Sequence, residues 1–187
     1  MSRTIYLAGL LIAGMVSASM AAGRSSHTFE GHTFSLELPP GYSFQADANP
    51  KAGVGMFGFT TEPRNDSSRG LIQVSLIDLS KAPPGETVTL ERFATAMIGG
   101  VQRRRTRWEQ TESDMQVGGV PARRIAWSGA IEPGFGRPPV YARGVMIAGI
   151  ASDLGFALHT QDVAPLADTT LPLCEEALRT FLLTQKR

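Results

Sequence analysis

The sequence predicts an α+β domain in which an antiparallel β-sheet is flanked by helices, as an α/β/α sandwich. Several short segments alternate apolar and polar residues between Pro/Gly turns, which is the period of half-buried strands. Two longer segments carry apolar residues three and four positions apart, which is the period of amphipathic helices. Gly118-Gly119 separates two strand-like segments and indicates a tight hairpin, so antiparallel neighbours are expected. Because each helix must bury its apolar face, we expect both helices to pack on the sheet.

The strands begin with residues 33–38, where Phe34, Leu36 and Leu38 alternate with polar residues. A Pro-Pro-Gly turn at 39–41 ends this strand, because proline fixes φ and glycine accepts positive φ. Further strands, separated by polar or Pro/Gly-rich loops, are expected at residues 42–44, 54–60, 71–79, 107–117, 120–131, 140–150 and 155–162.

The first helix is expected over residues 90–101, which carry a sustained apolar stripe. Thr89 is a suitable N-cap for it, and Glu91 is favourable beside the positive end of the helix dipole. The second helix is expected over residues 171–183. Pro172 would then lie in its first turn, where the missing N–H has no helical partner to lose.

Length and composition restrict the class of protein. A chain of 187 residues with 42% hydrophobic residues is long enough for one globular domain. The 18 Lys and Arg residues nearly balance the 17 Asp and Glu residues, so no nucleic-acid partner is expected. The single cysteine, Cys174, excludes an intrachain disulfide and a cysteine-rich zinc site. We expect Cys174 to be buried, because a helical face would join it to Leu178, Phe181 and Leu182.

The first 21 residues have the three parts of a secretory signal peptide. Arg3 gives a positively charged start, residues 5–16 are apolar, and Ser19 and Ala21 suit a cleavage site. The alternative is an uncleaved anchor, since residues 4–23 carry no charge. The expected organisation is a signal peptide at residues 1–21, a flexible segment at 22–32 and a single domain at 33–187. The mature protein is expected to be periplasmic or secreted, without a stable membrane anchor.

Two patterns that could bind a cofactor or a metal lack the context that such sites need. Residues 53–58 match G-x-G-x-x-G, but no helix that could hold a pyrophosphate is expected after them. Glycines inside a strand explain this pattern better. His27 and His32 lie five residues apart without an evident third ligand. We therefore expect neither a cofactor nor a metal site.

Two segments are candidates for contact with a partner, either a protein or an anionic component of the cell envelope. The densest charge cluster could bind an anionic partner and consists of Arg103, Arg104, Arg105 and Arg107. Favourable interaction of these cations with the end of the first helix would also explain the cluster. The second candidate is the Pro/Gly-rich loop 132–139, in which Phe135 and Arg137 are residue types common at interfaces. Phe135 could instead fold back onto the core.

The order of these features resembles that of PsbP-like domains. Residues 33–42, TFSLELPPGY, are similar to the opening of these domains, in which a strand ends in Pro-x-Gly and an aromatic residue. A helix, a V-G-G-V-P-A hairpin and a closing helix follow in the same order, so the resemblance covers residues 29–183. It implies a sheet between helices and a mostly non-catalytic role in binding or assembly. A photosystem partner is not implied, since no chloroplast transit peptide is evident.

The sequence therefore predicts an exported, non-enzymatic binding or assembly module. The alternative hypothesis is a periplasmic hydrolase that uses His159 and Asp153. A serine hydrolase needs Ser, His and Asp in relay geometry, and the sequence has no G-x-S-x-G motif. A polar hairpin is the favoured interpretation of His159, and the hydrolase hypothesis requires Asp153, His159 and a hydroxyl to converge in a cleft.

Overall fold

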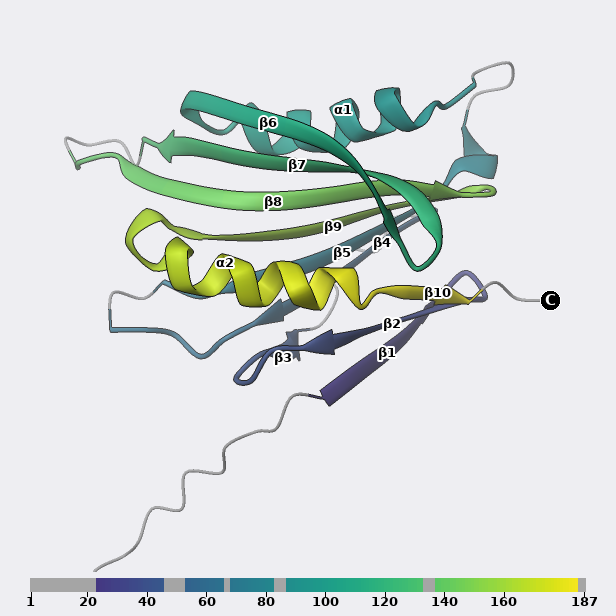
Figure 1. The fold of residues 1–187 in the computed structure, drawn as a ribbon, viewed down its shortest axis with the longest axis horizontal. Helices are drawn as coiled ribbons and strands as arrows, with labels where there is room; N and C mark the ends of the chain where they lie inside the picture. Colours follow the sequence, from purple (N-terminus) through teal and green to yellow (C-terminus); the bar gives the residue numbers. More distant parts are fainter. Residues whose placement is uncertain (1–22, 46–52, 66–67, 83–86, 133–136, 185–187) are drawn as a thin grey trace, which may run out of the picture.

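The computed structural model describes residues 23–45, 53–65, 68–82, 87–132 and 137–184. Within these ranges the chain forms ten strands, two α-helices and one short 3-10 helix (Figure 1). In chain order these elements are β1 Gly23–Phe29, β2 His32–Leu38, β3 Ser43–Gln45, β4 Val54–Thr60, β5 Leu71–Asp78, η1 Leu79–Lys81, α1 Leu90–Gln102, β6 Thr106–Val117, β7 Val120–Ile131, β8 Val140–Ala151, β9 Leu154–Val163, α2 Ala164–Arg179 and β10 Leu182–Thr184.

The strands form two sheets, and every strand pair in them is antiparallel. The main sheet has the order β3-β4-β5-β9-β8-β7-β6, and the small sheet has the order β1-β2-β10. Short connections join β6 to β7 and β8 to β9, as expected for antiparallel neighbours. The α+β class with an antiparallel sheet, predicted from the sequence, is confirmed.

The two helices lie on opposite faces of the main sheet. α1 packs against β7, β8 and β9, and α2 packs against β8, β9 and β2. In β8, Met146 belongs to the cluster beneath α1, whereas its neighbour Ile147 belongs to the cluster beneath α2. Successive strand residues point to opposite faces, so the two helices cannot share one. The predicted sandwich is therefore found in part, because the small sheet accompanies α2 on its side and α1 covers only part of the other.

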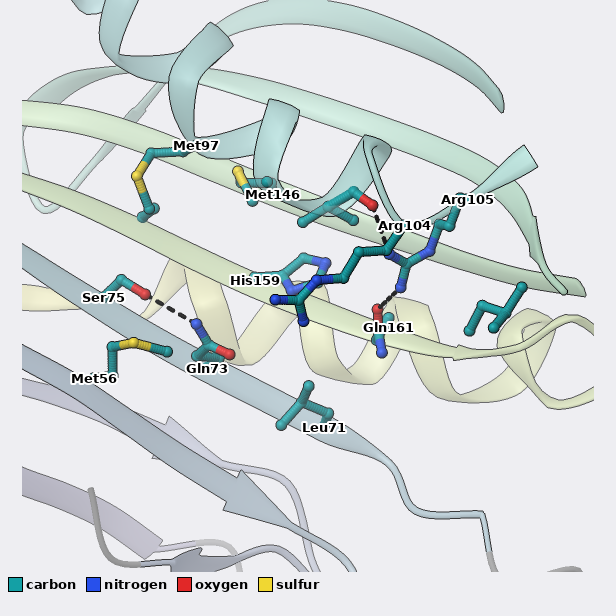
Figure 2. Close-up of a pocket in the computed structure, with 14 residues that line it drawn as sticks. Met56, Leu71, Gln73, Ser75, Met97, Arg104, Arg105, Met146, His159 and Gln161 are labelled. Carbon is teal, nitrogen blue, oxygen red and sulfur yellow. Dashed lines mark hydrogen bonds between the residues drawn. The ribbon is translucent and has the colours of Figure 1, made fainter. Parts of the chain in front are cut away.

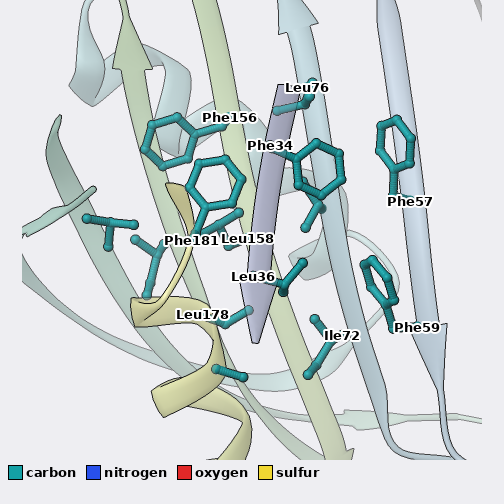
Figure 3. Close-up of a cluster of buried hydrophobic side chains, with 14 of the residues drawn as sticks. Phe34, Leu36, Phe57, Phe59, Ile72, Leu76, Phe156, Leu158, Leu178 and Phe181 are labelled. Atoms are coloured by element: carbon teal, nitrogen blue, oxygen red, sulfur yellow. The ribbon is translucent and has the colours of Figure 1, made fainter. Parts of the chain in front are cut away.

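The larger hydrophobic cluster fills the space between the main sheet, α2 and the small sheet (Figure 3). The ring centroids of Phe34 and Phe57 lie 4.8 Å apart, and those of Phe156 and Phe181 lie 5.1 Å apart. Burying each such side chain contributes roughly 1.5–3 kcal/mol to folding. These contacts join both ends of the described chain to the centre of the main sheet.

Beneath α1, the Trp127 ring lies against the backbone of Gly144. A Cβ atom on Gly144 would come within 2.5 Å of the Trp127 ring, so only glycine leaves room for it. The same ring stacks on Trp108 and on His159, at centroid distances of 5.2 Å and 5.8 Å. These stacked rings lie beneath α1.

Residues 23–29 form β1, where the sequence predicts part of a flexible segment at 22–32. β1 pairs with β2 over its whole length, from Gly23 opposite Leu38 to Phe29 opposite His32. The turn residues Glu30 and Gly31 have φ angles of 49° and 86°, as in a tight two-residue hairpin. An unrecognised turn thus joins these residues to the first predicted strand, and they form a strand of the small sheet.

The second helix begins and ends earlier than the predicted range 171–183. α2 spans Ala164–Arg179, with Pro165 in its first turn and Pro172 in its interior. Pro165 is thus the proline that suits a helix start. The hydroxyl of Thr180 donates to the carbonyl of Ala177 over 2.8 Å where the helix ends, and β10 follows. In the part of the chain that the structure describes, no helix has the length and apolar character needed to cross a bilayer.

Cys174 is buried on α2, as predicted, together with Leu178. Its Sγ atom lies 3.0 Å from the Tyr42 hydroxyl. Phe181 is also buried, although it follows the helix rather than belonging to it. Leu182 lies on β10 and is exposed, so the predicted apolar face is wrong at this residue.

Candidate functional site

The four clustered arginines lie where α1 ends and β6 begins, but they face different surroundings. Arg103 is the C-cap of α1, and its backbone N–H donates to the carbonyl of Gly99 over 3.1 Å. Arg103 and Arg104 are exposed, and neither forms an ion pair within the described ranges. Arg105 is half-buried. The predicted cluster is therefore divided between the surface and the interior.

Arg105 is directed inward, under the end of α1. Its Nη1 donates to the carbonyl of Val101 over 2.8 Å, and its Nη2 donates to Oε1 of Gln161 over 2.6 Å. The guanidinium carbon lies 4.4 Å from the centroid of the Trp127 ring, which is a cation–π distance. Burial, and then the neighbouring charge of Arg104, lower the pKa of Arg105. The groups that contact the Arg105 guanidinium, a carbonyl, an amide and an indole ring, are all neutral.

Arg107 belongs to the arginine cluster and lies near the candidate loop 132–139. It has a φ angle of 50° and lies at a register shift in β6, where the regular pairing with β7 is interrupted. Its guanidinium donates to the hydroxyl of Tyr141 and lies over the ring of that residue. Thr106, one residue earlier, donates to Oε1 of Glu132 over 2.9 Å. Glu132 is the first residue of the candidate loop 132–139, so the start of that loop contacts the segment that carries the arginine cluster.

Of the two candidate residues in the loop 132–139, the structure describes Arg137 but not Phe135. Arg137 is exposed. Phe135 lies outside the described residues. The flanking residues Ile131 and Val140 are 38% and 42% exposed, which is high for large apolar side chains.

A cavity of about 490 Å³ lies beside Arg105, between α1 and the main sheet (Figure 2). Figure 2 shows Arg104, Arg105 and Gln161 at one end of this cavity and Met56 and Met97 at the other. Its lining comes from the end of α1, from the two arginines that follow it, and from strands β4, β5, β7, β8 and β9. Met56, at 38% exposed, and the exposed Arg104 mark its opening to solvent.

His159 lies in the lining of this cavity, near its middle (Figure 2). The residue is 7% exposed, and its Nε2 atom has no hydrogen-bond partner among the residues that the structure describes. Burial, and then the charge of Arg105, lower the pKa of His159 to about 4. The imidazole is therefore neutral at pH 7.

Asp153 and His159 do not converge, contrary to the hydrolase hypothesis. Asp153 lies in the turn before β9, and its carbonyl accepts a hydrogen bond from the N–H of Leu79. His159 follows six residues later along an extended strand, which is a separation of about 20 Å. Ser152, the hydroxyl residue next to Asp153 in sequence, shares the turn with it. The arrangement cannot form a catalytic relay.

The patterns considered for cofactor and metal binding have structural roles. Residues 54–60 form β4, so the glycine pattern leads into a strand and not a helix. His27 stacks on Phe34 with ring centroids 5.3 Å apart, and its Nε2 lies 2.8 Å from the hydroxyl of Ser25. Among the described residues, no group of three or more His, Cys, Asp and Glu side chains could hold a metal ion.

Solved structures show where this architecture occurs. The solution structure of cyanobacterial PsbP (CyanoP) from Synechocystis matches with a TM-score of 0.58 and 15% sequence identity, over 92% of this chain and 99% of that chain. The fold is that of a PsbP-like domain. The crystal structure of LpqN, which is involved in cell envelope biogenesis of Mycobacterium tuberculosis, matches with a TM-score of 0.60 and 12% identity, over 88% of this chain and 92% of that chain. No protein-family model matches the sequence, and no curated protein matches it.

In this domain with a PsbP-like fold, the sequence predicted the basic end of the cavity but not the cavity itself. Arg104 and Arg105 were candidates because they lie in a visible charge cluster. Gln161, Met97 and Met146 were missed, because they come from β9, α1 and β8 and meet only in the folded chain.

Proposed function

We propose that this protein is an exported, non-enzymatic binding module that contacts an anionic partner in the cell envelope through Arg103, Arg104 and Arg107. The exposure of Arg103 and Arg104, without a carboxylate partner in the described residues, is the observation that carries the proposal. We call these three residues the arginine patch. Exposed guanidinium groups attract anionic surfaces over distances of about 10 Å at moderate ionic strength.

Exposed apolar side chains beside the arginine patch support a contact role. Tyr141, which Arg107 covers, is 44% exposed. Ile131 and Val140 extend this apolar surface along the ends of β7 and β8. Arginine and tyrosine are enriched among the residues that dominate binding energy at interfaces.

Two further observations agree with a role in the envelope. The fold is shared with LpqN, a protein involved in cell envelope biogenesis. The N-terminal residues have the order of a secretory signal peptide. If the chain is exported and cleaved, the intact mass of the protein from the exported fraction will correspond to a start near Ala22. A chain that retains Met1 and fractionates with membranes would contradict this part of the proposal.

The binding role is tested by reversing charges in the arginine patch. Binding of the unaltered protein is measured by co-sedimentation with vesicles that contain phosphatidylglycerol and by cross-linking to an acidic envelope protein. We expect Arg103→Glu/Arg104→Glu to abolish the binding that the unaltered protein shows in these assays. Binding should also weaken as salt is added, because salt screens exposed charges. Thermal unfolding should change little, since surface substitutions usually stay within about 0.5 kcal/mol each.

A matched control changes the net charge by the same amount at another part of the surface. Arg69 and Arg92 are both exposed and lie outside the patch, so Arg69→Glu/Arg92→Glu should bind as the unaltered protein does. Equal loss of binding in both double variants would show a dependence on net charge alone. Unchanged binding of the Arg103→Glu/Arg104→Glu variant would refute a role of these two residues.

A further inference from the structure

Arg105 differs from every other half-buried arginine in the described residues. Four of these five arginines have a carboxylate partner: Arg64 with Asp162, Arg123 with Asp114, Arg124 with Glu175 and Arg143 with Asp168. Arg105 has only the carbonyl of Val101 and the amide oxygen of Gln161, and its buried Nε has no partner in the described part of the chain. Charged groups are seldom withdrawn from water without an opposite charge. The cavity thus has at its inner end the half-buried charge of Arg105, which no carboxylate in the described protein neutralises, in addition to the exposed Arg104 at its opening.

His159 adds a second unsatisfied group to the same cavity. Its side chain is more than nine-tenths buried, and its Nε2 has no protein partner in the described ranges. Buried polar atoms are nearly always hydrogen bonded. A neutral imidazole can donate one N–H to an anion that also accepts from a guanidinium.

The remaining lining of the cavity is suited to an apolar body. Met56, Met97 and Met146 face it, and thioether side chains adapt to ligands of different shape. Gln73 and Ser75, which also line it, form a hydrogen bond to each other at 3.0 Å. The volume of about 490 Å³ lies within the range of small-molecule sites.

We propose that this cavity binds a monocarboxylate with an apolar body, whose carboxylate lies between Arg105 and His159 and whose body lies against the three methionines. Arg105 is the one uncompensated guanidinium that is withdrawn from solvent, since Arg104 is exposed at the opening of the cavity. This single inner charge matches a carboxylate better than the double charge of a phosphate monoester. The site shares Arg104, at its opening, with the arginine patch, but the carboxylate contacts proposed here are made by Arg105 and His159, which are not part of that patch.

Calorimetric titration of the full folded chain with decanoate, below its micelle-forming concentration, tests the proposal. We expect saturable binding of one decanoate. Acetate lacks the apolar body and decanol lacks the charge, so each should bind at least about tenfold more weakly. Decylammonium should not compete, because its charge repels Arg105. Equal binding of decanol and decanoate, or no saturable binding of decanoate, would overturn the proposal.

Substitutions of the two polar groups test where the carboxylate lies. His159→Leu and Arg105→Met keep the apolar part of each side chain, and each should weaken decanoate binding about tenfold or more. Decanol binding should change less than twofold in both variants. The single substitution Arg103→Glu changes a residue outside the cavity lining and should leave decanoate binding unchanged. Loss of decanoate binding in Arg103→Glu would indicate surface association instead.

Adjacent glycines in α1 provide a matched pair for blocking the cavity. Gly100 lines the cavity, and a Cβ atom there would meet no atom within 4 Å. Gly99 does not line it, and a Cβ atom there would meet only the end of Arg103 at 3.7 Å. We expect Gly100→Leu to reduce decanoate binding at least tenfold and Gly99→Leu to leave it unchanged. Both replace glycine in a helix, so unfolding curves can verify that neither loses stability. Undiminished binding in Gly100→Leu, together with undiminished binding in His159→Leu, would show that decanoate binds elsewhere.

Discussion

Arg64 and Asp162 form a bidentate ion pair that joins the loop after β4 to the end of β9. Both nitrogen–oxygen distances are 2.8 Å, and the Asp162 side chain is only 2% exposed. The N–H of Val163 also donates to this carboxylate over 2.8 Å. A charge buried to this degree is tolerated because its partners are fixed in place.

Removing one member of this pair should destabilise the protein strongly. We expect Arg64→Met to lower the free energy of unfolding by about 3–5 kcal/mol, because it leaves an uncompensated buried carboxylate. Arg64→Met/Asp162→Leu should recover most of that loss. Urea unfolding measures both values. The exposed pair Arg24–Glu37 is the control, and Arg24→Met should cost less than about 1 kcal/mol. Equal losses for the two single variants would show that burial of Asp162 is unimportant.

The thiol of Cys174 should react slowly in the folded protein. It is 2% exposed and in contact with the Tyr42 hydroxyl, and burial raises the pKa of the thiol. Fewer molecules therefore carry the reactive thiolate at neutral pH. We expect a thiol reagent to modify the urea-unfolded chain rapidly and the native chain only at the rate of opening. Rapid native labelling would contradict the placement of this residue. Cys174→Ala should cost on the order of 1 kcal/mol.

Acidification should destabilise the protein through His159. Its pKa is about 4 in the folded protein and near 6.5 when unfolded, so the unfolded chain binds the proton first as pH falls. The stabilisation is present above pH 6.5 and is lost as pH falls toward 4, by roughly 3 kcal/mol at most. His159→Phe should lack this component, while the carboxylates titrate alike in both proteins. Parallel pH dependence of the two unfolding free energies would show that His159 does not contribute.

The close approach of Trp127 to Gly144 gives a stability prediction with its own control. Gly144→Ala places a methyl group 2.5 Å from the ring and from the carbonyl oxygen of Thr160, so we expect a loss of about 1–3 kcal/mol. Gly58 is also a strand glycine, but a Cβ atom there meets nothing within 4 Å. Gly58→Ala should therefore be neutral or stabilise by up to about 1 kcal/mol. Thermal unfolding of both variants distinguishes these outcomes.

Local periodicity predicted most of the main sheet and the first helix. Strand β4 has the predicted limits 54–60, and α1 begins at Leu90 after the Thr89 cap, whose hydroxyl accepts from Arg92 N–H over 3.3 Å. Such signals lie within a few residues and do not depend on the rest of the chain. The start of α2 was less predictable, because packing of Cys174 and Leu178 stabilises a helix that continues through Pro172.

Strand β1 was missed although the sequence contains a sign of it. The triplet His-Thr-Phe occurs at 27–29 and again at 32–34, and the two copies pair in the antiparallel hairpin. His27 lies opposite Phe34, and Phe29 lies opposite His32. A repeat across the two residues Glu30 and Gly31 is compatible with a tight turn. The candidate cavity had no comparable signal, since its lining residues are brought together by the order of strands in the main sheet.

Pairing of β10 with β2 has a consequence for the timing of folding. Leu183 lies opposite Phe34, and Phe181 packs on Phe34 with ring centroids 5.9 Å apart. A chain that leaves the ribosome or an export channel N-terminus first must therefore expose β2 and its phenylalanine until residues 181–184 have emerged. Such late contacts delay closure of the core and favour interaction of the incomplete chain with chaperones. For a chain exported as proposed above, the same delay would keep the half-translocated chain unfolded and able to pass through a narrow channel.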